Sequence, residues 1–214
     1  MRTYEYKDLL MVPFQGGPIL NNMYVVADVK QKECIVIDPS FEFDRVLEFI
    51  KEKKWKISAF WLTHSHMDHI IGTQAAFDFD PPIPLAMHPE AESIRQHGGS
   101  ARSNGGAPVF RSPDPSILLA DGMILKVGDY PFEVLYTPGH APGHCCFYAK
   151  DPGWLFTGDL VFYHDRGRTD LIGGSEEVEI ASIKNKVLTL PNETIIFPGH
   201  EDFTSVGEER QFYE

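Results

Sequence analysis

The sequence predicts an α/β fold in which two packed, mixed β-sheets are flanked by outer helices. Short apolar runs with strand character recur along the chain, and helical patterns fall between some of them. The alternation lacks the regular period of a doubly wound or barrel protein, which favours two packed sheets. The 214 residues, 43% of them hydrophobic, can bury a substantial core. We expect residues 1–214 to form a single domain.

Nine segments are predicted as strands because they are apolar or alternating and are bounded by turn residues. In chain order they are residues 19–29, 33–38, 57–62, 84–87, 123–127, 132–137, 144–149, 154–158 and 194–199. Many of these segments are short and can pair as hairpins, which favours sheets of mixed direction.

Three helices are predicted. Residues 43–50 and residues 180–190 carry apolar side chains at helical spacing. Ser175, followed by two glutamates, is a plausible cap for the second of these helices. A third helix is expected from just after Asp68 to about Phe77.

Residues 97–116 form a long segment rich in glycine, serine and proline. A loop of this length in a compact domain is usually either a functional rim or a mobile segment. The sequence does not decide between these two roles for residues 97–116.

The charge balance argues against a nucleic acid or an anionic membrane as the partner. The 31 acidic and 19 basic residues give a formal net charge of -12, without a strong basic cluster. The N-terminus is too polar for a signal peptide, and the sequence contains no run of about 18 apolar residues. Three cysteines do not make a disulfide framework and suit a reducing compartment. We expect a cytoplasmic protein.

The segment "THSHMDH", residues 63–69, places four metal-ligand side chains in six positions directly after an apolar run. Imidazole nitrogen and carboxylate oxygen are ligands that zinc and similar ions take. His64 and His66 lie at i and i+2 where a strand ends, so they point to the same side. Asp68 and His69 begin the predicted helix and can turn toward a second position, because one ion cannot easily use all four.

Three further ligand-type residues each follow a β-rich run and a glycine. They are His140 in "TPGHAPGH", Asp159 in "LFTGDL" and His200 in "FPGH". Glycine permits a sharp turn, so each side chain can be presented at one edge of the sheets. A His-x-His pair alone is weak evidence, but seven such residues at strand ends predict a metal site.

These motifs resemble the metallo-β-lactamase superfamily, whose His-x-His-x-Asp-His pattern is matched by residues 64–69. The match covers nearly the whole chain. The stretches "TPGHAPGH", "LFTGDLVF", "GRTDL" and "FPGHEDFTSVGEE" are similar to the glyoxalase II branch, the hydroxyacylglutathione hydrolases, and to their shorter single-domain relatives. The resemblance implies an αββα sandwich with its metals in a groove at one edge of the two sheets.

The resemblance also implies two divalent ions, most often zinc, with iron or manganese as the other options. One ion would be held by His64, His66 and His140, the other by Asp68, His69 and His200, and Asp159 would bridge them.

Two further residues match family positions. Asp38 stands where a carboxylate supports the ligand loop, although an acidic turn residue before a proline is an equally simple interpretation. Arg168 stands where glyoxalase II enzymes carry a basic residue that contacts the glutathione carboxylate. The tyrosine expected two positions later is Asp170 here, so a turn in which Arg168 pairs with Asp170 is the alternative.

The implied reaction is hydrolysis of a thioester such as an acyl-glutathione of the S-lactoylglutathione type. Two ions about 3.5 to 4 Å apart can share a hydroxide, because the pKa of a bound water falls to about 7. A thiolate with a pKa of about 8.5 leaves with little help. Asp68 and Asp159 are expected to position or transfer the proton. Because few residues follow His200, we expect the C-terminal helical domain of full-length glyoxalase II to be absent, and residues 97–116 could replace part of its pocket wall.

The main alternative is an iron-dependent persulfide dioxygenase, which shares the fold and most of these ligands. There a single iron would be held by His64, His140 and Asp159, with open positions for oxygen and substrate.

A β-lactamase or a lactonase ranks lower. Many zinc β-lactamases have a cysteine or no bridging carboxylate at the position of Asp159, and the "GRTD" stretch is unusual for lactonases. A binding module with a purely structural metal ranks last, because a closed site uses four ligands rather than seven. The sequence does not indicate an oligomeric state.

Overall fold

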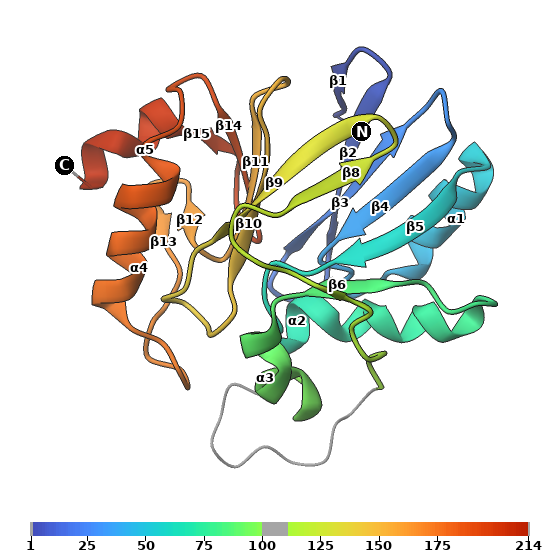
Figure 1. The fold of residues 1–214 in the computed structure, drawn as a ribbon, viewed down its shortest axis with the longest axis horizontal. Helices are drawn as coiled ribbons and strands as arrows, with labels where there is room; N and C mark the ends of the chain where they lie inside the picture. The colour runs from blue at the N-terminus through green and yellow to red at the C-terminus, as the bar shows by residue number, and fades with distance from the viewer. Residues whose placement is uncertain (1, 100–110, 214) are drawn as a thin grey trace.

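Two β-sheets pack face to face in the computed structural model, which describes residues 2–99 and 111–213, and helices cover both outer faces (Figure 1). This arrangement confirms the predicted sandwich of two mixed sheets with outer helices.

The first sheet holds the N-terminal part of the chain and has seven strands in the described residues, in sequence order from β1 to β7. They are β1 (Tyr4–Tyr6), β2 (Leu9–Gly16), β3 (Asn21–Asp28), β4 (Glu33–Ile37), β5 (Lys56–Trp61), β6 (Leu85–Met87) and β7 (Ile117–Leu118). Neighbours from β1 to β4 are antiparallel, and neighbours from β4 to β7 are parallel. Strand β3 is buried along its whole length because both faces of the sheet are covered.

The second sheet has six strands in the described part of the chain, in the order β15-β14-β11-β10-β9-β8. They are β8 (Ile124–Val127), β9 (Tyr130–Tyr136), β10 (Cys145–Ala149), β11 (Trp154–Gly158), β14 (Ile195–Pro198) and β15 (Thr204–Ser205). Only the β11 and β14 pair is parallel in this sheet. A small hairpin of β12 (Val161–Phe162) and β13 (Asp165–Arg166) stands beside it.

The helices lie on the two outer faces. On the side of the first sheet they are α1 (Asp44–Lys53), α2 (Met67–Ile70), the 3-10 segments η1 (Ile71–Asp78) and η2 (Pro89–Ala91), and α3 (Glu92–Gln96). On the side of the second sheet they are α4 (Glu176–Ser182), the π-helical segment η3 (Ile183–Val187) and α5 (Val206–Tyr213). No helix in the described ranges is long and apolar enough to cross a membrane.

Three apolar clusters hold these layers together. The largest lies between the sheets, where Phe156 stacks on Phe197 with ring centroids 5.2 Å apart and Tyr24 packs edge-on against both. A second cluster joins the outer face of the first sheet to α1, and a third joins the second sheet to η3 and α5. Each fully buried large apolar side chain contributes about 1.5 to 3 kcal/mol of transfer free energy, so the sandwich is the main source of stability.

All nine predicted strands are present, at slightly shifted bounds. Strand β2 was missed because its interior proline, Pro13, is unfavourable in most strands, and β1 is short and polar. The helix expected after Asp68 is a single α-helical turn that continues as the 3-10 segment η1. The cap was correctly predicted, since the Ser175 hydroxyl accepts the backbone N–H of Val178 at the start of α4.

Candidate metal centre

The structure brings all seven predicted ligands together at one edge of the sandwich, because each lies just after the carboxyl end of a strand. His64, His66, Asp68 and His69 follow β5, His140 follows β9, Asp159 follows β11 and His200 follows β14. The strands are rigid, buried elements, so the side chains that follow them have defined positions.

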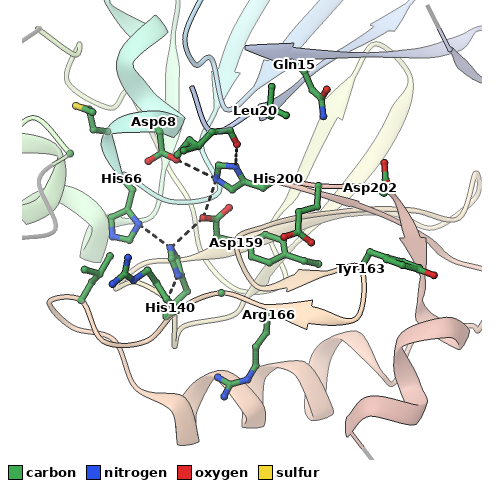
Figure 2. Close-up of a pocket in the computed structure, with 18 residues that line it drawn as sticks. Gln15, Leu20, His66, Asp68, His140, Asp159, Tyr163, Arg166, His200 and Asp202 are labelled. Atoms are coloured by element: carbon green, nitrogen blue, oxygen red, sulfur yellow. Dashed lines mark hydrogen bonds and ion pairs between the residues drawn. The ribbon is translucent and has the colours of Figure 1, made fainter. Parts of the chain in front are cut away.

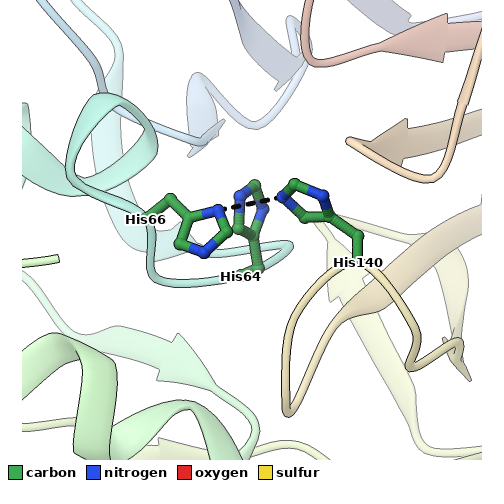
Figure 3. Close-up of side chains that lie close together, drawn as sticks. All are labelled: His64, His66 and His140. Carbon is green, nitrogen blue, oxygen red and sulfur yellow. Dashed lines mark hydrogen bonds between the residues drawn. The ribbon is translucent and has the colours of Figure 1, made fainter. Parts of the chain in front are cut away.

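The first ligand group consists of His64, His66 and His140 (Figure 3). One nitrogen of each lies within 4.8 Å of the others, and His66 Nδ1 is 2.9 Å from His140 Nε2. All three rings are buried. Burial, followed by the neighbouring imidazoles, lowers the pKa of His66 to about 3 and that of His64 well below its ordinary value. These rings are therefore neutral, which is the form that binds metals.

The second ligand group consists of Asp68, His69 and His200. Asp68 Oδ2 lies 3.4 Å from His69 Nε2 and 3.3 Å from His200 Nε2. The chain places these atoms around one point although His200 is far from the other two in sequence.

Asp159 stands between the two groups. Its Oδ1 is 3.2 Å from His69 Nε2, and its Oδ2 is 3.5 Å from His200 Nε2 and 3.7 Å from His140 Nε2. One carboxylate therefore contacts members of both groups, as a bridging ligand would.

Two observations test whether metal ions fit these residues. Bonds of about 2.0 to 2.1 Å in a tetrahedral site place neighbouring ligand atoms about 3.3 Å apart, which agrees with the separations around Asp68 and Asp159. His64 Nε2, His69 Nε2 and Asp159 Oδ1 are buried and make no hydrogen bond to any described residue. Buried polar atoms without partners are costly unless something binds them, so the residues present fit two cations.

Contacts on the far side of the rings fix which nitrogen carries the proton. His69 Nδ1 lies 3.0 Å from Asp38 Oδ2, and His140 Nδ1 lies 2.8 Å from the Arg168 carbonyl oxygen. His200 Nδ1 lies 3.0 Å from the Ile19 carbonyl oxygen. In each case the acceptor requires a proton on Nδ1, which leaves the Nε2 lone pair free for a metal.

Asp38 is buried, and both of its carboxylate oxygens accept hydrogen bonds from neighbouring residues. Its Oδ1 accepts the Thr63 backbone N–H at 2.8 Å, and its Oδ2 accepts the Thr63 hydroxyl at 2.6 Å as well as His69. The Thr63 hydroxyl oxygen is in turn 3.0 Å from His64 Nδ1. The structure thus places Asp38 directly behind the ligand segment, with one histidine of each group within its network.

The second group carries strong opposing charges. Burial disfavours the protonated form of His200, but the carboxylates of Asp159 and Asp68 raise its pKa to about 9, and Asp159 and Asp68 raise the pKa of His69 as well. Burial also disfavours the ionised form of Asp68, yet His69 and His200 hold the pKa of Asp68 below its usual range. A group of this composition attracts a cation, and that cation displaces the imidazolium protons.

Gly199 is required by close packing. A Cβ atom at this position would lie 2.2 Å from Asp159 Oδ1 and 2.7 Å from His69 Cε1. Any side chain here would push the Asp159 carboxylate away, so the glycine of "FPGH" is needed for steric reasons.

The ligands open onto a cleft of about 1000 Å³ (Figure 2). Asp68, with 19% of its side chain exposed, is one of the carboxylates that face this space, whereas His64 and His69 lie beneath it. Apolar side chains on its wall include Leu20, Met67 and Tyr163. The cleft is therefore apolar on part of its wall and polar at its base.

Arg168 lines the same cleft, but its guanidinium is paired. Its Nε and Nη2 each lie 2.7 Å from an oxygen of Asp170, and both side chains are exposed. The turn pairing that the sequence left open is thus present, while contact with a substrate stays a prediction. Of the segment 97–116, Gly99 lines the cleft and accepts the Met67 backbone N–H, and residues 100–110 lie outside the described residues.

Several residues at the site were not identified from the sequence. Asn21 Nδ2 donates to Asp68 Oδ2 at 2.8 Å, and the neighbouring Asn22 reaches the His200 turn. His144 is fully buried with its ring centroid 5.3 Å from that of His64, and burial lowers its pKa to about 3. The only signal for the asparagines was a polar pair at the start of a strongly apolar strand.

A family model described as the metallo-beta-lactamase superfamily matches residues 16–200. The chain belongs to this superfamily. Its membership confirms the resemblance carried by the His-x-His-x-Asp-His motif, and the sandwich is the fold of its structural neighbours.

Three relatives place the chain within the superfamily. The hydroxyacylglutathione hydrolase GloC of Haemophilus influenzae is 33% identical over 187 residues, which are 85% of this chain and 86% of that protein. The crystal structure of BLEG-1 B3 metallo-beta-lactamase has a TM-score of 0.81 at 33% identity and covers 94% of this chain and 96% of that one. The structure of TTHA1623 in a di-iron-bound form has a TM-score of 0.78 at 33% identity, with coverages of 94% and 98%.

Proposed function

We propose that this protein is a dinuclear metallo-hydrolase that cleaves thioesters, with acyl-glutathiones of the S-lactoylglutathione type as the first substrate class to test. The observation that carries the proposal is the pair of ligand groups joined by Asp159 at the base of an open cleft. The similarity to a hydroxyacylglutathione hydrolase supports the substrate class, and a neighbour described in a di-iron form supports two ions.

The first group, His64, His66 and His140, would hold one ion, and Asp68, His69 and His200 would hold the other, with Asp159 shared. When bound, two such ions supply Lewis acidity and a water that is ionised near neutral pH. Zinc suits the mixed nitrogen and oxygen ligand set, and iron or manganese suits it as well.

The chain's own residues supply positioning and proton transfer. Asp68 faces the cleft and is held ionised, so it can accept the proton of an attacking water. Asp159 lies between the groups and keeps their nitrogen atoms in a fixed relation. A thiolate leaving group needs no general acid because its pKa is about 8.5. The nearby His66 is neutral and buried, so it has no extra proton to donate to a leaving group.

A second candidate function is hydrolysis of a β-lactam. It is favoured by the similarity to BLEG-1 B3 metallo-beta-lactamase over 94% of the chain. Both reactions add water to a carbonyl carbon, so the same ligand groups would serve either substrate, and the apolar wall of the cleft would decide between them.

The test is metal analysis of the purified protein together with three assays. These are hydrolysis of S-lactoylglutathione, hydrolysis of a chromogenic cephalosporin, and oxygen uptake with glutathione persulfide. We expect about two ions per chain and thioester hydrolysis. A single iron with oxygen uptake would replace the proposal by the mononuclear oxygenase, in which His64, His140 and Asp159 hold the iron. Two ions with cephalosporin turnover alone would favour the β-lactamase.

A further inference from the structure

The turn that carries His200 is held by a buried amide from the other sheet. Asn22, on β3 and 2% exposed, donates its Nδ2 protons to the carbonyl oxygens of Pro198 and Glu201, each at 3.0 Å. Its backbone N–H donates to the Gly199 carbonyl at 2.7 Å. One residue of the first sheet therefore binds three carbonyl groups that surround His200.

Two neighbours of Asn22 complete this contact between the sheets. The carbonyl oxygen of Ile19 accepts from His200 Nδ1, and His200 lies beside Asp68 (Figure 2). Asn21 Nδ2 lies 2.8 Å from Asp68 Oδ2 and 3.4 Å from His200 Nε2. Successive residues of a strand point to opposite faces, so the adjacent amides approach the turn from two sides. The Asn21 amide contacts the side chains of Asp68 and His200, whereas the Asn22 Nδ2 donates to backbone carbonyl oxygens.

The turn needs this support because its backbone is strained. Glu201 has a φ of +64°, in the left-handed region that costs a non-glycine residue about 1 kcal/mol or more. The Glu201 side chain is exposed and makes no hydrogen bond or ion pair with other described residues. The Glu201 carbonyl accepts from the Asn22 amide, while the Tyr24 hydroxyl donates to the Pro198 carbonyl and the Gly199 N–H donates to the Gly158 carbonyl earlier in the turn.

We infer that Asn22 is the positioning residue of the second ion: by fixing the turn from Pro198 to Glu201 it holds His200 Nε2 about 3.3 Å from Asp68 Oδ2. The inference rests on the proposed dinuclear site. The first group, His64, His66 and His140, has no hydrogen bond to Asn22, so its ion does not depend on this residue.

The decisive variant is Asn22→Asp, which keeps the size of the side chain but replaces two donors by acceptors that face carbonyl oxygens. Zn²⁺ binding is measured by competition with a chelator and by the metal content of the folded protein. We expect the affinity of the second ion to fall about 10- to 100-fold, while the affinity of the first changes less than about threefold. Melting in the metal-free state shows how much of the effect is general destabilisation.

Asn192→Asp is the matched control, because it makes the same chemical change at an exposed site where the side chain accepts from Arg210. It should leave both affinities unchanged. If Asn22→Asp does not fold, Asn22→Ser keeps one donor and should show a smaller loss that is again confined to the second ion.

The outcomes separate the inference from the proposed function. A wild type that binds two ions and an Asn22→Asp variant with unchanged affinities would overturn the inference alone. Equal loss of both ions in the variant would assign Asn22 a general structural role and overturn it too. A wild type that never binds a second ion would overturn the dinuclear site and the inference with it.

Discussion

Replacing Asp38 by asparagine should weaken metal binding without removing any ligand. The Thr63 backbone N–H is a fixed donor 2.8 Å from Asp38, so the amide oxygen of an asparagine must face it. The amide NH₂ then takes the place of Oδ2 and points at His69 Nδ1 and at the Thr63 hydroxyl. His69 can accept this bond only if its proton moves to Nε2, where the metal would bind.

The displaced proton also affects the first group. Once its oxygen accepts from the asparagine, the Thr63 hydroxyl turns its own proton toward His64 Nδ1, 3.0 Å away. His64 then also carries its proton on Nε2. Changes in groups that orient metal-binding histidines typically cost 10- to 100-fold in affinity, which is about 1.4 to 2.7 kcal/mol per ion.

The measurements are Zn²⁺ affinity by chelator competition and the tautomers of the histidines by ¹⁵N NMR of the metal-free protein. We expect both ions to bind more weakly and His69 to change from the imidazolium, protonated on both nitrogens, to the neutral Nε2–H form. Thr63→Val, with Asp38 intact, should keep the proton on His69 Nδ1 and so serves as the control. A folded Asp38→Asn variant with wild-type affinities and a proton still on His69 Nδ1 would refute this reasoning.

Three further predictions follow from the site. His200→Ala should lower the metal content from about two ions to about one and reduce hydrolysis by several orders of magnitude; a folded variant that keeps both ions would show that His200 is not a ligand. Arg168→Ala should raise KM for glutathione thioesters but not for small thioesters, whereas Asp170→Asn, which frees the guanidinium, should lower it; equal effects on both substrates would leave the pair a structural role. Burial raises the pKa of Glu179 from 4.5 to about 7 despite its bond to Arg166, so the folded state binds this proton more tightly than the unfolded state. The tighter binding of this proton contributes up to about 3 kcal/mol to the free energy of unfolding. The contribution is complete below about pH 4.5 and is lost as the pH rises through about 7. Glu179→Gln should flatten the unfolding free energy over that range, and parallel curves for variant and wild type would contradict it.

The strands were predictable because their signal is local. Apolar and β-branched residues between turn residues are found within a few positions of each other, and the burial that they imply is the burial observed. The seven ligand-type residues were visible for the same reason, since each stands at the end of such a run. The missed strands also have local causes. In β2 the proline at position 13 argues against a strand, but pairing with β3 stabilises the strand nevertheless.

The tertiary structure decided how the ligands are grouped and what supports them. Asp159 contacts both ligand groups because β5, β9, β11 and β14 end at the same edge of the sandwich. From the sequence, this contact was only implied by the resemblance to a family. The same holds for Asn22, whose side-chain partner Pro198 lies 176 residues away in the sequence. A single strand residue carries no local mark of such a contact, because the free energy of a hydrogen bond depends on which atoms the fold brings within about 3 Å and on whether water is excluded from them. The sequence therefore determined which residues have metal-binding side chains, and the packing of the two sheets determined which of them lie close enough to share an ion.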